Sequence, residues 1–153
     1  GQREAATREA MAAHALAPDD PAIAIQAARL LQGQGDDGPS RAAKLLDGYV
    51  RAHPDEQAVR LALARVYLAD RQLKPARATI DAALKRDPDD PQALFLSAHA
   101  AYQAKDLGTV RSQLIRYTDL PDAARRKLDR RAVTRAEIEG LSGLLGDDDH
   151  QLI

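Results

Sequence analysis

Residues 33–38 read Gly-Gln-Gly-Asp-Asp-Gly, which matches by letter the fingerprint of dinucleotide-binding loops. That fingerprint holds pyrophosphate on backbone N–H groups between a β-strand and a helix. Here a helical pattern precedes the segment, and its two carboxylates would repel a phosphate. We therefore interpret the segment as a turn between two helices and predict no cofactor there.

The histidines offer no better candidate for chemistry. They stand at positions 14, 53, 99 and 150, and no two of them have the short helical spacing that a shared metal site favours. Ser97 and His99 are two residues apart, so on a helix their side chains point about 200° apart. The sequence therefore predicts neither a metal site nor a hydrolytic pair, and the chain is not expected to be an enzyme.

Two charged runs lie near the end of the sequence. Asp147 to Asp149 lack the alternating spacing, the glycine and the terminal glutamate of a calcium loop. Residues 125–135 hold a basic cluster: Arg125, Arg126, Lys127, Arg130, Arg131 and Arg135. These side chains spread around most of a helix, and no aromatic residue lies among them for base stacking. The pattern favours a solvated face over nucleic-acid binding, with docking to an acidic neighbouring surface as the alternative.

The composition points in the same direction. Apolar residues make up 44% of the 153 residues, but aromatic residues only 3%, and the net charge is -1. Near-neutrality gives no general attraction to nucleic acid or to an anionic membrane. No apolar run approaches the roughly 18 residues that a membrane span needs. Cysteine is absent, which excludes disulfides and thiolate ligands.

The elements of the chain are marked by regularly spaced prolines. Pro18, Pro54, Pro88 and Pro121 lie 36, 34 and 33 residues apart, which indicates a repeat of about 34 residues. The 36-residue interval is explained by a longer turn at residues 35–39. Asp20-Pro21 and Asp90-Pro91 are typical helix starts, an N-cap acid followed by proline in the first turn.

Residues 57–90 form the clearest unit, with two amphipathic helices joined by a turn near Asp70. The apolar face of the first helix is Val59, Leu63, Val66 and Tyr67. The apolar face of the second is Ala76, Ile80, Ala83 and Leu84. The units on either side repeat this arrangement, so the sequence predicts a series of antiparallel helix pairs.

This pattern resembles the tetratricopeptide repeat. Its characteristic positions fall on Leu63, Ala64, Tyr67, Ala76, Ala83 and Pro88. The outer units carry substitutes, such as Val110 and Tyr117 where alanine is expected. The large early aromatic residue of the family is missing in every unit, and Arg60 takes its place in the middle unit. The resemblance covers roughly residues 1–121 and implies an all-α fold, a right-handed α-solenoid of antiparallel helix pairs.

The resemblance also divides the chain. We expect a trailing half-repeat at 1–18, full repeats at about 21–56, 57–90 and 91–121, a helical cap of one or two segments at 122–145, and a frayed acidic tail at 146–153. A half-repeat would leave its apolar face unpaired, so we expect the chain to be a piece of a longer array. The abundance of alanine and arginine suggests a bacterial source.

In this family the first helices line the concave surface, which implies a protein-binding groove here. The residues implied are Ile25, Arg29, Gln32, Leu61, Arg65, Leu68, Phe95, His99, Tyr102 and Gln103. Arg29, Arg65 and His99 would form a ladder of hydrogen-bond donors, and Ile25, Leu61 and Phe95 a parallel apolar row. Of the places that bind a chaperone tail in related repeats, only Arg29 has a suitable side chain, which disfavours that ligand.

The resemblance therefore implies a scaffold that binds a protein or an extended peptide, in bacterial envelope assembly, secretion or exopolysaccharide export. It slightly favours the periplasm over the cytoplasm and leaves the oligomeric state open. The alternatives are a purely structural spacer without a ligand and, disfavoured by the missing catalytic spacing and the few aromatic residues, an enzyme or an RNA-binding repeat.

Overall fold

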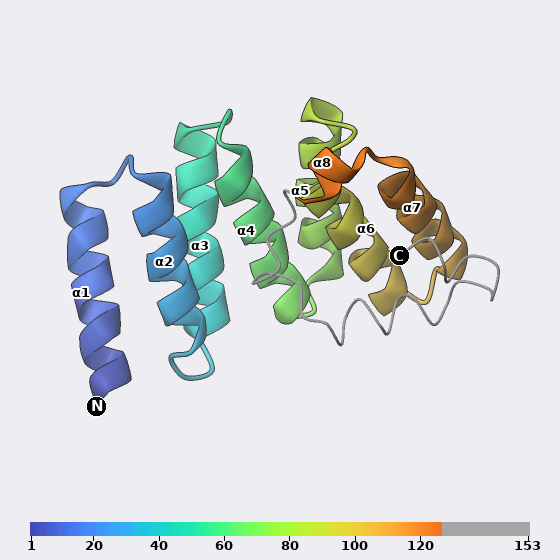
Figure 1. Ribbon diagram of the computed structural model, residues 1–153. Coiled ribbons are helices and arrows are strands. Elements are labelled where there is room, and N and C mark those ends of the chain that lie inside the picture. The colour runs from blue at the N-terminus through green and yellow to red at the C-terminus, as the bar shows by residue number, and fades with distance from the viewer. Residues whose placement is uncertain (127–153) are drawn as a thin grey trace. The chain divides into compact units, whose positions relative to one another are not determined.

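The computed structural model describes residues 1–126, and these residues form helices joined by short turns (Figure 1). The helices are α1 (Gln2–Leu16), α2 (Pro21–Gln32), α3 (Gly38–Ala52), α4 (Gln57–Ala69), α5 (Leu73–Arg86), α6 (Pro91–Gln103), α7 (Leu107–Asp119) and α8 (Asp122–Arg125). The prediction of an all-α helical-repeat fold is confirmed for this part of the chain. Most of the expected cap at 122–145 and the expected tail at 146–153 lie outside the described residues.

The helices α2 and α6, each the first helix of a repeat, begin where the aspartate-proline pairs predict. The carboxylate of Asp20 accepts hydrogen bonds from the backbone N–H groups of Ala22 and Ile23, at 2.9 and 3.1 Å. Asp90 does the same for the two corresponding N–H groups of α6. An N-cap of this kind satisfies backbone donors that the helix itself leaves unpaired. It stabilises the fold by about 1 kcal/mol relative to alanine at the same position.

The chain divides into two compact units, residues 1–79 and 80–153. In the first, α1, α2, α3 and α4 lie side by side; each packs on the next, and α2 also touches α4 (Figure 1). Residues of α2, α3 and α4 form its core: Ala24, Ala28, Leu31, Ala42, Ala43, Leu46, Tyr49, Val59, Ala62, Leu63 and Val66. Val59, Leu63 and Val66 of the stripe predicted for the first helix of residues 57–90 lie in this core, and Tyr67 packs against it.

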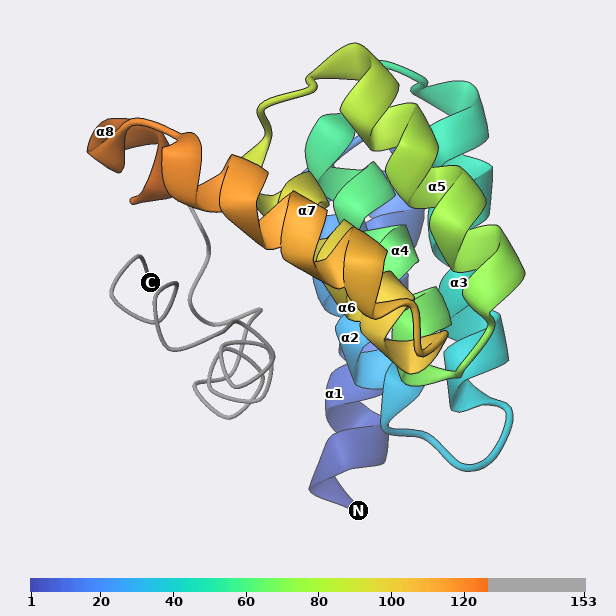
Figure 2. The ribbon, with the colours of Figure 1, turned by 90° about the vertical axis from the view of Figure 1, so that its right-hand side faces the viewer.

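In the second unit, α6 packs against α7, and α8 follows beyond the end of α7 (Figure 2). The core between α6 and α7 consists of Phe95, Ala98, Ala101, Val110 and Leu114, with Tyr117 packed at its edge.

Small residues allow the helices to approach closely. Ala64 on α4 and Ala98 on α6 are both 0% exposed. Gly38, the first residue of α3, shows the same requirement, because a Cβ there would overlap the carbonyl oxygen of Leu31 on α2. Volume added at such sites strains a close-packed interior.

The turns within repeats share one backbone conformation. Arg71 after α4 and Lys105 after α6 have φ values of 56° and 60°, in the left-handed region that L-residues avoid. After α4, the N–H of Gln72 donates to the carbonyl of Tyr67 at 2.8 Å and the N–H of Arg71 to that of Leu68 at 3.1 Å. The same two hydrogen bonds recur 34 positions later, after α6, which is the Schellman arrangement of a helix end.

The turn at residues 33–37 joins α2 to α3, as interpreted from the sequence. Gly35 has a φ of 62°, so glycine supplies the left-handed residue in this longer turn.

Candidate functional site

The candidate site in the first unit lies on the first helices, α2 and α4, which touch each other. Arg29 on α2 is exposed, and Gln32 is partly exposed. Arg65 on α4, the repeat equivalent of Arg29, is partly exposed. Ile25 is partly buried against the core of the unit. This unit therefore offers two cationic side chains from neighbouring helices, with an apolar residue beside one of them.

Two other predicted residues of this unit are part of its interior. Leu61 is 4% exposed and Leu68 is 2% exposed, so neither offers a surface to a ligand in this structure. Their predicted role in binding is untested and stays a prediction. The physical reason for their burial is that α4 is covered on more than one face: Val59, Ala62, Leu63 and Ala64 are buried as well.

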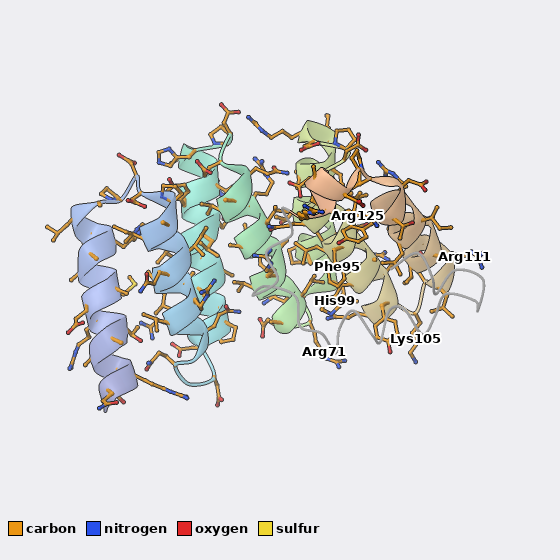
Figure 3. The ribbon with its side chains drawn as sticks, in the orientation of Figure 1. Arg71, Phe95, His99, Lys105, Arg111 and Arg125 are labelled. Atoms are coloured by element: carbon orange, nitrogen blue, oxygen red, sulfur yellow. The ribbon has the colours of Figure 1, made fainter. Side chains whose placement is uncertain are left out.

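In the second unit the predicted residues all come from α6. Phe95 is 4% exposed and packs in the core between α6 and α7. His99, one turn further along the helix, is partly exposed (Figure 3). Tyr102 is 47% exposed, which makes it the most accessible aromatic residue of the described chain.

His99 has a neighbour that defines its hydrogen bonding. The side-chain amide nitrogen of Gln103 lies 3.2 Å from Nε2 of His99. The amide of Gln103 can therefore form a hydrogen bond with this ring nitrogen. His99, Tyr102 and Gln103 thus present a polar and aromatic group at the end of α6.

One charged residue of α4 is buried without being a candidate for binding. Arg60 is 9% exposed, and its guanidinium donates to Oε1 of Gln57 at 3.3 Å and to the carbonyl oxygen of Pro54. These acceptors satisfy the buried donors and anchor the start of α4 to the preceding loop.

A second cluster in the first unit was not predicted. It joins the loop after α1 to the end of α3, where the hydroxyl of Tyr49 donates to the carbonyl of Asp19 at 2.8 Å. Nε2 of His53 lies 2.9 Å from Oδ1 of Asp19, and the ring of Tyr49 lies 4.4 Å from that of His53. The sequence signal that could have predicted the contact between Asp19 and His53 is their separation of 34 positions, which is the length of one repeat.

The surroundings of Tyr49 alter its acidity. Burial raises the pKa of the Tyr49 phenol, and the nearby carboxylates of Glu56, Asp19 and Asp20 raise it further. The acids of two loops therefore gather around one end of the unit. The contacts of Tyr49 and His53 with Asp19 hold the loop after α1, and the gathered carboxylates assign no ligand.

No group of three or more histidine, aspartate or glutamate side chains within residues 1–126 is arranged to hold a metal ion. No helix in that range has the length and hydrophobicity required to cross a bilayer.

Comparisons with known proteins agree with the repeat pattern. A family model described as "Tetratricopeptide repeat" matches residues 39–108. Cellulose synthase operon protein C of Pseudomonas fluorescens (strain SBW25) is 39% identical over 85 residues, which is 54% of this chain and 6% of that protein. The chain thus corresponds to a small part of that relative's length. No solved structure matches at a significant level. With their paired helices, alanine-lined contacts and 34-residue turn spacing, residues 39–108 of this chain are tetratricopeptide repeats.

Proposed function

We propose that this chain binds extended protein segments through accessible side chains of its first helices, α2 and α4 in the first unit and α6 in the second. Tetratricopeptide repeats generally mediate protein–protein interactions. The observation that carries the proposal here is the accessibility of equivalent polar side chains: Arg29 is exposed, and Arg65 and His99 are partly exposed, while most of the neighbouring apolar residues are buried.

The chemistry of these side chains defines the ligand. Arg29 and Arg65 come from α2 and α4, two helices in contact, and both are cationic donors. Arginine binds carboxylates and backbone carbonyl oxygens, and an extended segment presents such acceptors at regular intervals. The proposed partner segment is therefore extended and acidic.

The relative suggests a setting. Its name refers to a cellulose synthase operon, and we propose that this chain likewise serves a bacterial apparatus for making or exporting an exopolysaccharide, on the periplasmic side. The partner would be another protein of that apparatus.

Selection of peptides from a random display library on the immobilised chain tests the proposal, followed by fluorescence anisotropy with the enriched peptides. Arg29→Glu with Arg65→Glu should weaken binding about tenfold, because two ion pairs at solvent-accessible side chains contribute roughly 0.2–1 kcal/mol each and reversal adds repulsion. Arg41→Glu with Lys44→Glu is the matched control, with the same charge change on exposed residues of α3.

The structure also decides which variants to avoid. Phe95→Ala would remove a buried ring from the α6–α7 core and cost about 3–5 kcal/mol, so lost binding would report unfolding. His99→Ala and Tyr102→Ala change accessible side chains and are suitable. If no peptide is enriched on the wild-type chain, or if both charge-reversed pairs bind equally, the chain is a structural spacer instead.

A further inference from the structure

The first helices of the first unit carry positive charge and no negative charge. Arg29 is the one charged residue of α2, α4 contains Arg60 and Arg65, and neither helix has an aspartate or a glutamate. Arg60 donates to groups at the start of α4. Within residues 1–126, the guanidinium of Arg29 forms no ion pair. The charge of these two helices is therefore complementary to the carboxylates of a ligand.

Arg29 and Arg65 stand at the same place in their helices. Each is the ninth residue of its helix, counted from Pro21 in α2 and from Gln57 in α4. The two helices run in the same direction and touch each other (Figure 1). Helices in contact have axes about 8–10 Å apart. The two arginine side chains therefore leave the surface at one level, from points separated by about 8–10 Å.

This separation matches one extended conformation better than another. In a β-strand, the side chains on one face recur every two residues, at about 6.6 Å and then at about 13 Å. In polyproline II, the side chains on one face recur every three residues, because the helix has three residues per turn. With a rise of about 3.1 Å per residue, they lie about 9.3 Å apart. Of the two conformations, polyproline II therefore presents its side chains at the spacing of the arginines.

Two neighbours of Arg29 suit the backbone and the rings of such a ligand. Polyproline II has no internal hydrogen bonds, so its carbonyl oxygens can accept bonds from a binding site. Gln32 lies one helical turn after Arg29 and is partly exposed, and its amide can donate to one of these carbonyls. Ile25 lies one turn before Arg29 and is partly buried against the core, which leaves an apolar edge for a proline ring.

We propose that α2 and α4 bind a protein segment in the polyproline II conformation that has an acidic residue at every third position. The segment crosses the two helices, and two successive carboxylates pair with Arg29 and Arg65. This inference rests on the proposed function and adds the conformation of the ligand and the spacing of its charges. Glutamate followed by proline is the simplest such sequence, because a residue before proline is itself restricted to extended backbone.

Three fluorescently labelled synthetic peptides of equal length test the proposal. The first consists of four Glu-Pro-Ala repeats. The second has the same composition, but its successive glutamates alternate between spacings of two and four residues, so that no two are three residues apart. The third has glycine in place of every proline of the first peptide, which keeps the spacing and removes the preformed conformation.

Fluorescence anisotropy measures their binding to the full chain at low salt, where pairs of surface charges are least screened. One ion pair at accessible side chains changes an affinity by a factor of about 1.4–5. We therefore expect the first peptide to bind about threefold more tightly than the second. The third should also bind more weakly than the first, because ordering a flexible segment costs entropy.

Single-arginine variants provide the decisive comparison, since one arginine cannot distinguish between two charge spacings. In Arg29→Gln, and separately in Arg65→Gln, the ratio of the affinities for the first and second peptides should fall to about one. The matched control is Arg41→Gln with Lys44→Gln, which removes exposed cations of α3 and should leave the wild-type ratio unchanged. Circular dichroism verifies that each variant is folded.

The possible outcomes separate this inference from the proposed function. Equal binding of the three peptides to the wild-type chain would overturn the inference and leave the binding of acidic segments in place. Tighter binding of the second peptide than of the first would assign a different extended conformation to the ligand. If none of the peptides binds, the proposed acidic ligand is wrong as well.

Discussion

Replacing Arg71 by glycine should stabilise the chain, although Arg71 sits in an ordered turn. The residue has a φ of 56°, and its N–H donates to the carbonyl of Leu68 at 3.1 Å. Both hydrogen bonds of the turn use backbone groups, so the substitution removes neither. The side chain of Arg71 is exposed and contributes little by packing.

The magnitude follows from two opposing effects. An L-residue in the left-handed conformation is strained by about 1–2 kcal/mol, through the approach of its Cβ to the following carbonyl oxygen. Glycine removes this strain but loses about 0.5–1 kcal/mol more conformational entropy on folding. The expected net gain is about 0.5–1 kcal/mol for Arg71→Gly. Lys105→Gly should give a similar gain, because Lys105 has a φ of 60° and the same pair of hydrogen bonds.

Urea unfolding followed by circular dichroism measures the gain as a higher midpoint at an unchanged slope. Arg71→Ala is one control, since it keeps the Cβ and should stay near the wild-type value. Ala82→Gly is the other, since glycine in an exposed helix interior should cost about 1 kcal/mol. A midpoint for Arg71→Gly at or below that of Arg71→Ala would refute the reasoning.

Two further predictions concern packing and alkaline pH. Ala64→Leu and Ala98→Leu should each destabilise the fold by about 1–3 kcal/mol through overpacking, whereas the exposed Ala58→Leu should change it by less than about 0.5 kcal/mol; thermal melts compare the three. Because the pKa of Tyr49 is raised, the contribution of its protonated phenol to the free energy of unfolding is fully present below pH about 10, the ordinary tyrosine pKa. That contribution is lost as the pH rises through the raised pKa. Urea unfolding between pH 8 and about 11.5 should therefore show a steeper alkaline loss for the wild type than for Tyr49→Phe, and equal slopes would contradict the assignment.

Helix positions in this chain were predictable because their signals are local and repeated. Asp20 and Asp90 each precede a proline, and both cap a helix in the structure. The apolar stripes around Leu63 and Ala98 are interior in the structure, since helical periodicity alone decides which residues share a face.

The burial of Leu61, Leu68 and Phe95 was not predictable in the same way. Periodicity identifies the most apolar face of a helix, but a helix between two neighbours is covered on several sides. The burial of Arg60 was not predictable for a related reason. It depends on the carbonyl oxygen of Pro54, which only the folded loop brings into place. The predicted binding role of these buried residues stays a prediction, and the accessible members of the candidate site are its polar residues and Tyr102.

The contacts of Asp19 determine where the chain tolerates changes in length. Tyr49 and His53 both reach this residue from the end of α3, so an insertion between α1 and α2 would displace two bonding partners at once. The connection at residues 33–37 has already absorbed two additional residues, with Gly35 in the left-handed conformation. Extra segments, affinity tags or reporter peptides are best placed there, and the loop at 17–20 should keep its natural length.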